Sequence, residues 1–230
     1  MNGLTRSLLV IFLIFFSVKL ISQDAFQEID RVYGLDPLLF NGRKYTYFFP
    51  QVTGGNQFLL STEYKTGEVT IKGNKFEGID LNYDIYNQLL LIQYAGESGS
   101  LNIIEVSKAW LESFRIGNLE FKLLDYGNGQ RFYQVLGEGP FFILYYWRKD
   151  LKLDASYGAS NFAFTPPIKS QYVLIGDKLW PFRNKRSLIS IFDRELKQDI
   201  KSYINRNKVR MKNASDQTMT QLINYIGNLE

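Results

Sequence analysis

Apolar and polar residues alternate in several short runs between residues 44 and 182, and turn-forming residues separate these runs. Alternation with a period of two is typical of strands that bury one face. In the clearest run, Leu119, Phe121 and Leu123 alternate with two charged residues. The same pattern predicts strands at 44–49, 57–62, 88–94, 101–106 and 172–182, and on either side of 137–140.

Glycine-containing turns connect these runs into predicted hairpins. One hairpin turns at 73–74, and the hairpin over 172–182 turns at 176–177. The run 141–147 is apolar on both faces and is expected to be a covered strand. The segment 154–168 contains two consecutive prolines and shows neither the apolar period of a strand nor that of a helix, so it is predicted to be a loop.

From residue 187 onward the apolar period changes to that of a helix. One stripe consists of Ile189, Phe192, Leu196, Ile200 and Tyr203. A second helix is predicted near the C-terminus, with Asn213 or Ser215 as its cap, Gly227 as its stop signal and four inward-facing residues: Met219, Leu222, Ile223 and Ile226. Asp193 is a further candidate cap.

Strands that follow one another without intervening helices favour an antiparallel sheet. We therefore expect an α+β fold that is mainly β, with an antiparallel meander, sandwich or partly closed barrel followed by a C-terminal helical hairpin. The β-rich body should cover 24–182, and the basic hairpin over 183–230 should pack on it within one globular domain.

The first residues have the layout of a secretory signal peptide. Arg6 precedes an apolar run at 8–16, and Lys19 interrupts its extension. A helix needs about 20 apolar residues to cross a bilayer, so we expect cleavage near Gln23, with a permanent membrane span as the alternative. The chain contains no cysteine to carry a lipid anchor, which predicts an exported protein that is not a lipoprotein, in the periplasm or at the cell surface.

Basic charge is concentrated near the C-terminus. Residues 183–212 contain ten basic and three acidic residues, whereas 24–182 contain 15 basic and 18 acidic residues. In a helical projection, four cations lie away from the apolar stripe: Arg194, Lys197, Lys201 and Lys208. They either keep the helix soluble or bind an envelope protein or anionic envelope surface. Nucleic acid is not an expected partner, because export removes that target and no RNA-binding or zinc-binding motif accompanies the charge.

The sequence contains neither histidine nor cysteine. A Ser-His-Asp triad, a cysteine nucleophile and the usual zinc, copper or haem sites therefore cannot be built from this chain alone. No metal site, cofactor or catalytic residue is predicted. Carboxylate chemistry would require two acids across a cleft, for which the candidates are Glu63, Glu68, Glu77, Asp80 and Asp84.

Aromatic residues make up 16% of the chain. Most of them fall in predicted strands and are expected to fill a core. The others could form a surface for a glycan or small molecule, and the candidates are Trp110, Tyr157, Phe162, Phe164 and Trp180.

Two regions of the chain carry a family resemblance. They are "GNQFLLSTEYKTGEVTIKGNKFEGIDLNYDIYNQLLLI" and "QYVLIGDKLWPFRNKRSLISIFDRELKQDIKSYINRNKVRMK". With the signal peptide and "NGRKYTYFFP", they resemble a family of uncharacterised exported proteins of Bacteroidota. The resemblance is clearest at Lys185, Ser187, Leu188, Phe192, Tyr203, Ile204, Asn207 and Lys208. It implies a diderm cell envelope and a β-then-helix layout, and it brings no active site with it.

These observations predict a non-catalytic protein of the cell envelope that acts as a binding or assembly module for an envelope partner. A β-protein that binds a small molecule or glycan is the alternative, and it would require an aromatic-lined concavity. A carboxylate-based hydrolase is the third possibility, and it would require two buried acids that face each other across a cleft.

Overall fold

The computed structural model describes residues 36–47, 52–96, 99–127, 129–155 and 161–229. The chain divides into two units between Asn41 and Gly42. In the first unit, residues 36–41 form a turn in which the Asp36 carboxylate accepts a hydrogen bond from the backbone N–H of Leu38. The predicted signal peptide and Tyr157 lie outside the described residues. All of the helices and strands given below belong to the second unit.

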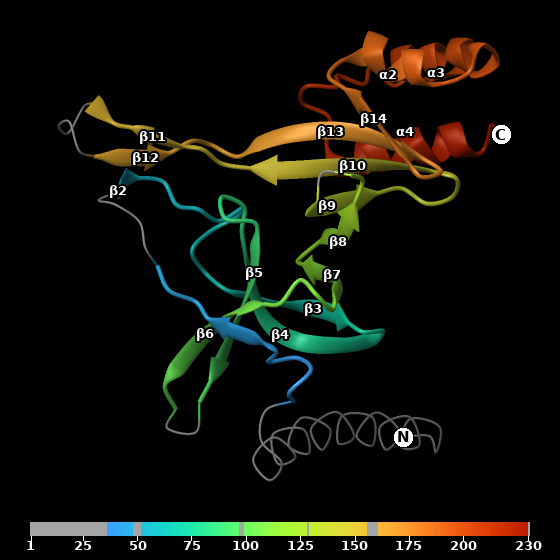
Figure 1. Ribbon diagram of the computed structural model, residues 1–230. Helices are drawn as coiled ribbons and strands as arrows, with labels where there is room; N and C mark the ends of the chain where they lie inside the picture. The colour runs from blue at the N-terminus through green and yellow to red at the C-terminus, as the bar shows by residue number, and fades with distance from the viewer. Residues whose placement is uncertain (1–35, 48–51, 97–98, 128, 156–160, 230) are drawn as a thin grey trace, which may run out of the picture. The chain divides into compact units, whose positions relative to one another are not determined.

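An antiparallel sheet of 11 strands forms the body of the second unit (Figure 1). The strands lie in the order β1-β6-β5-β4-β3-β7-β8-β9-β10-β13-β14, so β1 and β14 are its open edges. Their bounds are β1 (Gly42–Lys44), β3 (Lys65–Ile71), β4 (Asn74–Asp84), β5 (Leu89–Ala95), β6 (Leu101–Val106), β7 (Leu111–Ile116), β8 (Leu119–Asp125), β9 (Gln130–Leu136), β10 (Phe141–Arg148), β13 (Ile168–Ile175) and β14 (Lys178–Phe182). A small second sheet has the order β11-β12-β2 and consists of β11 (Leu151–Leu153), β12 (Phe162–Phe164) and β2 (Val52–Gly54).

The large sheet is strongly curved, as an aromatic cluster on one of its faces shows. The ring of Tyr83 on β4 lies 5.3 Å from that of Phe132 on β9, although three strands separate β4 from β9 in the sheet. In a flat sheet these strands would lie about 19 Å apart, at about 4.8 Å per strand. The ring of Phe114 contacts both of these rings, and the ring of Phe121 contacts that of Tyr83. The concave face is therefore a packed aromatic core.

A β-bulge at Gly78 introduces part of this curvature. Glu68 pairs with Glu77 and Gly67 pairs with Ile79, which leaves Gly78 as an extra residue with φ +73°. Glycine adopts this left-handed conformation without steric cost, and a bulge bends its strand and increases the local twist.

Three helices follow β14: α2 (Lys185–Ile191), α3 (Arg194–Arg206) and α4 (Asp216–Gly227). Asn184 and Ser187 form a capping box at the start of α2. The extended backbone of Phe192, at φ −88° and ψ 162°, ends α2 and separates it from α3. Ser215 caps α4 by accepting a hydrogen bond from the Thr218 N–H.

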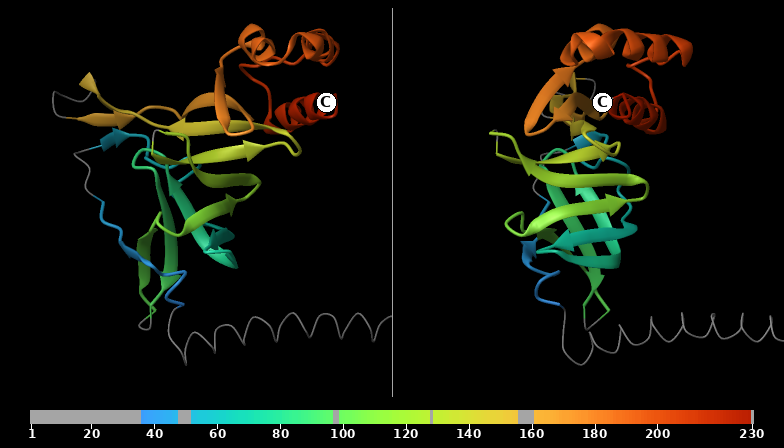
Figure 2. Two further views of the ribbon diagram at one scale, coloured as in Figure 1. Left: turned by 45° about the vertical axis from the view of Figure 1, so that its right-hand side comes forward. Right: turned by 90° about the vertical axis from the view of Figure 1, so that its right-hand side faces the viewer.

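The helices lie at the β10 to β14 end of the sheet (Figure 2). α4 packs on β9 and β10, and α2 packs on β14. The shared core contains Ile143 and Val173 from the sheet, together with Leu188, Ile200 and Ile223 from the three helices. A hydrogen-bond chain adds a polar link, because Trp147 Nε1 donates to Gln134 Oε1 and Gln134 Nε2 donates to Asp216 Oδ2.

The structure confirms the predicted fold class: α+β, mainly β, with an open antiparallel sheet followed by C-terminal helices. The strand predicted at 101–106 is confirmed with its bounds, and the turn predicted at 176–177 connects β13 and β14. The four inward-facing residues predicted for the last helix are all buried. The helical hairpin consists of α3 and α4, and α2 precedes it as a separate helix. Among the described residues, no helix has the length and apolar character needed to span a membrane.

The strand predicted at 57–62 is wrong. Only Phe58 forms a bridge there, with Asp84. The Lys149 ammonium instead donates hydrogen bonds to the carbonyls of Asn56 and Phe58, at 2.8 and 2.6 Å. Buried backbone carbonyls require hydrogen-bond partners, and a buried lysine provides them here in place of a neighbouring strand.

Three further boundaries differ from the prediction. The first strand is β1, three residues at 42–44. Residues 45–47 of the strand predicted at 44–49 are not part of a strand, and residues 48–49 lie outside the described residues. The turn between β3 and β4 uses Lys72 and Gly73, both with positive φ, one residue earlier than predicted. The predicted loop 154–168 contains β12, which pairs in parallel with β2. Strands of three residues are too short to show a period in the sequence.

Candidate functional site

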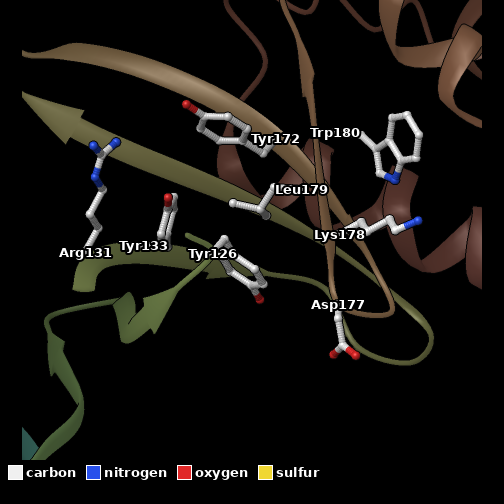
Figure 3. Close-up of a pocket in the computed structure, with 8 residues that line it drawn as sticks. All are labelled: Tyr126, Arg131, Tyr133, Tyr172, Asp177, Lys178, Leu179 and Trp180. Carbon is white, nitrogen blue, oxygen red and sulfur yellow. The ribbon is translucent and has the colours of Figure 1, made fainter. Parts of the chain in front are cut away.

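A hollow of about 380 Å³ opens on the face of the sheet opposite the helices (Figure 3). Alternate residues of a strand point to opposite faces. Val173 joins the helix core, so the neighbouring Tyr172 points away from the helices. The lining residues are Tyr126, Arg131, Tyr133, Tyr172, Asp177, Lys178, Leu179 and Trp180.

Tyr133 lies at the centre of a tyrosine cluster on this face. Its ring centroid is 6.2 Å from that of Tyr126, 6.0 Å from that of Tyr172 and 6.0 Å from that of Tyr146. The Tyr133–Tyr172 contact is edge to face, at 87°. Tyr133 is buried, whereas the other three are partly exposed. Tyr133 therefore forms the floor of the hollow, and its neighbours present ring surface to solvent.

Charged side chains surround the aromatic floor. The Arg131 guanidinium lies 5.2 Å from the centre of the Tyr146 ring, a cation–π contact. Figure 3 shows Leu179 on the same side of β14 as the tyrosines, whereas the side chains of Lys178 and Trp180 lie on its other side. Asp177 is exposed in the turn between β13 and β14.

The environment raises the pKa of two phenols that line the hollow, Tyr133 and Tyr126. Burial raises the pKa of Tyr133, and the neighbouring Tyr172 adds to the effect while Arg131 opposes it. Burial also raises the pKa of Tyr126, with a further contribution from the negative charge of Asp177. None of the four tyrosine hydroxyls hydrogen-bonds to another residue that the structure describes. They are available to donate to or accept from a ligand.

The hollow has the features of a small-ligand site. Such sites are concave, commonly about 300 to 1,000 Å³ in volume, and combine aromatic surface with a few polar groups. Here the aromatic surface comes from the tyrosines, and hydroxyls, one guanidinium and one carboxylate provide the polar groups. The ring surfaces and the polar rim together suit contact with a ring-shaped polar molecule.

Two of the acidic candidates, Glu68 and Glu77, line a second, open hollow of about 400 Å³, but neither of them is buried. Glu68 and Glu77 are strand partners, and the Lys75 ammonium lies between them at 3.1 and 2.6 Å from their oxygens. Asp80 is exposed and accepts a hydrogen bond from Thr66. Glu63 is exposed in the loop before β3.

Asp84 is the buried acid of this set. It accepts hydrogen bonds from the Asn87 backbone and side chain, at 2.8 Å each, and from the Tyr45 hydroxyl at 3.2 Å. Burial raises the pKa of the Asp84 carboxyl. These contacts fix the turn between β4 and β5. The described residues contain no group of three or more side chains that could hold a metal ion.

The structure does not bring the aromatic candidates together. Trp110 is 41% exposed before β7, and the Lys72 ammonium lies 3.4 Å from its ring centre. Phe162 and Phe164 belong to β12 in the small sheet, where Phe164 is buried against Tyr86. Trp180 is 44% exposed and is the one candidate that lines the hollow.

The four basic candidates occupy one C-terminal region. Arg194, Lys197 and Lys201 lie on α3, and Lys208 follows its C-terminal cap. Arg194, Lys201 and Lys208 are exposed, and Lys197 is partly buried. None of them forms an ion pair with a carboxylate in the part of the chain that the structure describes.

The central residues of the hollow were not candidates in the sequence. Arg131 and Tyr133 are two residues apart in one predicted strand, so they point to the same face of it, and Tyr172 lies in a predicted hairpin. This signal gives the face of each strand. It does not reveal that β10 lies between β9 and β13 in the sheet, and the hollow depends on that order.

The sequence matches no protein-family model, and it has no significant match among curated proteins or solved structures.

Proposed function

We propose that this chain is a non-catalytic carbohydrate-binding protein of the cell envelope. The observation that carries the proposal is the hollow centred on Tyr133, which two partly exposed tyrosines, Tyr126 and Tyr172, line beside it. The envelope location rests on the apolar run at 8–16 after Arg6 and on the family resemblance.

A sugar ring suits this site for two reasons. One face of a pyranose presents C–H groups, which pack on an aromatic ring, while its hydroxyls require donors and acceptors. The tyrosines supply both from one side chain, and Arg131 and Asp177 extend the polar rim. The hollow is open to solvent on one side, so one sugar residue of an oligosaccharide can enter it while the other sugar residues stay outside.

The test is binding of the full chain to immobilised glucose, galactose, mannose and N-acetylglucosamine oligosaccharides, followed by calorimetry on any that bind. Tyr172→Ala removes an exposed wall of the hollow and should weaken binding at least about tenfold, which corresponds to about 1.4 kcal/mol. Trp110→Ala is the matched control, because it removes an exposed aromatic ring outside the hollow.

The expected result is saccharide binding that depends on Tyr172 and not on Trp110. Failure of every saccharide to bind would contradict the proposal. Equal affinities of the wild type and Tyr172→Ala would also contradict it, because the sugar would then bind at another site.

A further inference from the structure

We propose that the basic face formed by Arg194, Lys197, Lys201 and Lys208 docks on the surface of an anionic lipid bilayer. The proposal is independent of the tyrosine hollow and of its ligand. It rests on the orientation of α3, on the separation of its charges, on the backbone of Lys208 and on the absence of apolar anchors.

The packing of α3 fixes which side faces solvent. Ile200 and Ile204 are buried in the core that the helices share with the sheet. At 100° per residue, Arg194, Lys197 and Lys201 fall within about 60° of one another. Arg194 and Lys201 lie about 80° and 60° from Ile204, the nearer buried isoleucine, whereas Lys197 lies about 20° from it and is partly buried. The helix has 13 residues and is about 20 Å long. The cations thus form a row whose direction the core determines.

The two acids of α3 lie on the side of the helix away from the row of cations, together with Arg206. In the same projection Glu195 and Asp199 fall more than about 100° from the row of cations. The exposed Asp193 directly precedes the row at the N-cap. None of the members of the row forms an ion pair with a described carboxylate. A solubilising surface commonly intersperses the two signs, whereas a row of one sign is complementary to an anionic surface.

Lys208 occupies a backbone position at which glycine is preferred. It has φ +51°, and it lies at the C′ position of a Schellman motif. The Lys208 N–H donates to the Asn205 carbonyl at 3.2 Å, and the Val209 N–H donates to the Ile204 carbonyl at 3.0 Å. A side chain in this left-handed conformation carries a steric penalty that glycine avoids. The lysine extends the row of cations beyond the end of the helix, which gives a reason for its presence there.

The same region lacks the apolar anchors of a protein interface. The exposed large hydrophobic residues of the described chain are Tyr47, Leu60, Tyr86, Leu101, Trp110, Leu153 and Trp180, and none of them lies within 183–229. Stable protein interfaces have an apolar or aromatic centre. A bilayer of anionic lipids needs no such centre, because each nearby lysine or arginine contributes independently to electrostatic binding. The observations therefore favour a lipid surface over an acidic protein.

The experiment is co-sedimentation of the full chain with vesicles of phosphatidylcholine, with or without about 30 per cent phosphatidylglycerol, at low and physiological salt. The first variant combines Arg194→Gln, Lys197→Gln, Lys201→Gln and Lys208→Gln. The matched control combines Lys44→Gln, Lys65→Gln, Lys122→Gln and Lys152→Gln, four exposed lysines on strands of the two sheets. Both variants lose the same charge, and circular dichroism verifies their folding.

Wild type and control should bind the anionic vesicles. The affinity of the first variant for these vesicles should be at least about a hundredfold lower. Neutral vesicles measure any binding through the apolar run at 8–16, which all three proteins share. Equal losses in the two variants would overturn the proposal, because net charge alone would then account for binding. Tighter binding of the wild type to soluble polyglutamate or heparin than to anionic vesicles would also overturn it, in favour of an acidic protein or polysaccharide.

Discussion

Gly137 lies directly against Ile223, at the point where the β9–β10 turn passes beneath α4. A Cβ atom at Gly137 would lie 2.3 Å from Ile223 Cγ2, and Gly137 has φ +97°. The turn and the helix can therefore meet only because residue 137 has no side chain.

Gly137→Ala should lower the free energy of unfolding by about 2 to 4 kcal/mol, as the sum of a left-handed backbone penalty and overpacking of the core. Gly139→Ala is the control, because Gly139 also has positive φ but would place its Cβ in open space. Gly139→Ala should lower the free energy of unfolding, measured by urea denaturation, by only about 1 to 2 kcal/mol. Equal losses in the two variants would contradict the role assigned to Ile223.

Two buried tyrosines provide a second matched pair. The Tyr145 hydroxyl is buried without a hydrogen-bond partner among the described residues, whereas the Tyr83 hydroxyl donates to Gln88 Oε1 at 2.8 Å. Tyr145→Phe should leave stability unchanged or raise it by up to about 1 kcal/mol, since it removes an unsatisfied polar group. Tyr83→Phe should lower it by about 1 to 3 kcal/mol. Thermal unfolding measures both, and a large loss in Tyr145→Phe would show that its hydroxyl has a partner.

Lys208 allows its charge and its backbone conformation to be tested separately. Lys208→Gly should raise the free energy of unfolding by about 1 kcal/mol, because glycine is favoured at φ +51°. Lys208→Ala removes the same charge but keeps the Cβ, so it should show no such gain. Comparable stability of the two variants in urea denaturation would contradict the predicted strain.

Stability should fall at alkaline pH as the buried phenols ionise. Burial raises the pKa of Tyr45 from 10.0 to about 12, and the Asp84 charge adds to the effect while a hydrogen bond from Gln57 opposes it. Because the folded-state pKa is the higher one, the contribution of Tyr45 is fully present below pH 10 and is lost as the pH rises toward 12.

Tyr45→Phe removes this contribution, so its free energy of unfolding should decrease less steeply with pH between 10 and 12 than that of the wild type. Denaturant titrations at several pH values measure the slope, and absorbance at the phenolate band follows ionisation. Burial raises the pKa of Tyr64, and the negative charge of an ionised Tyr45 adds to this effect, so Tyr45→Phe also removes that smaller contribution. Identical slopes would show that Tyr45 ionises normally in the folded state.

Local signals in the sequence predicted the fold class and many of the elements. Alternation located β6 and the β13–β14 hairpin because each strand buries one face. The helical period identified Met219, Leu222, Ile223 and Ile226 because α4 packs one stripe on the sheet. These features depend on residues close together in the chain.

Features that depend on distant pairings could not be predicted. Lys149 donates hydrogen bonds to the backbone carbonyls of Asn56 and Phe58, more than 90 residues earlier in the chain. No local sequence pattern indicates such a contact. The tyrosine hollow likewise requires the order of β9, β10 and β13 in the sheet. The aromatic candidates chosen by position in loops or at strand ends were therefore scattered, while the central tyrosines were assigned to the core.

The order of the strands has a consequence for folding. β3 to β6 form one series of sequential hairpins and β7 to β10 form another. Among the described strands, the pair β3–β7 alone joins the two series by hydrogen bonds in the sheet, while Tyr83 packs on Phe121 and Phe132 of the other series. Gly67 permits this pairing, since a Cβ there would lie 2.1 Å from the Arg115 carbonyl oxygen. Hairpins form quickly from local contacts, whereas pairing across a long intervening segment is slow. We therefore expect each series to form early and the β3–β7 pairing to limit the folding rate, with hydrogen exchange revealing two cooperative units that divide along this line.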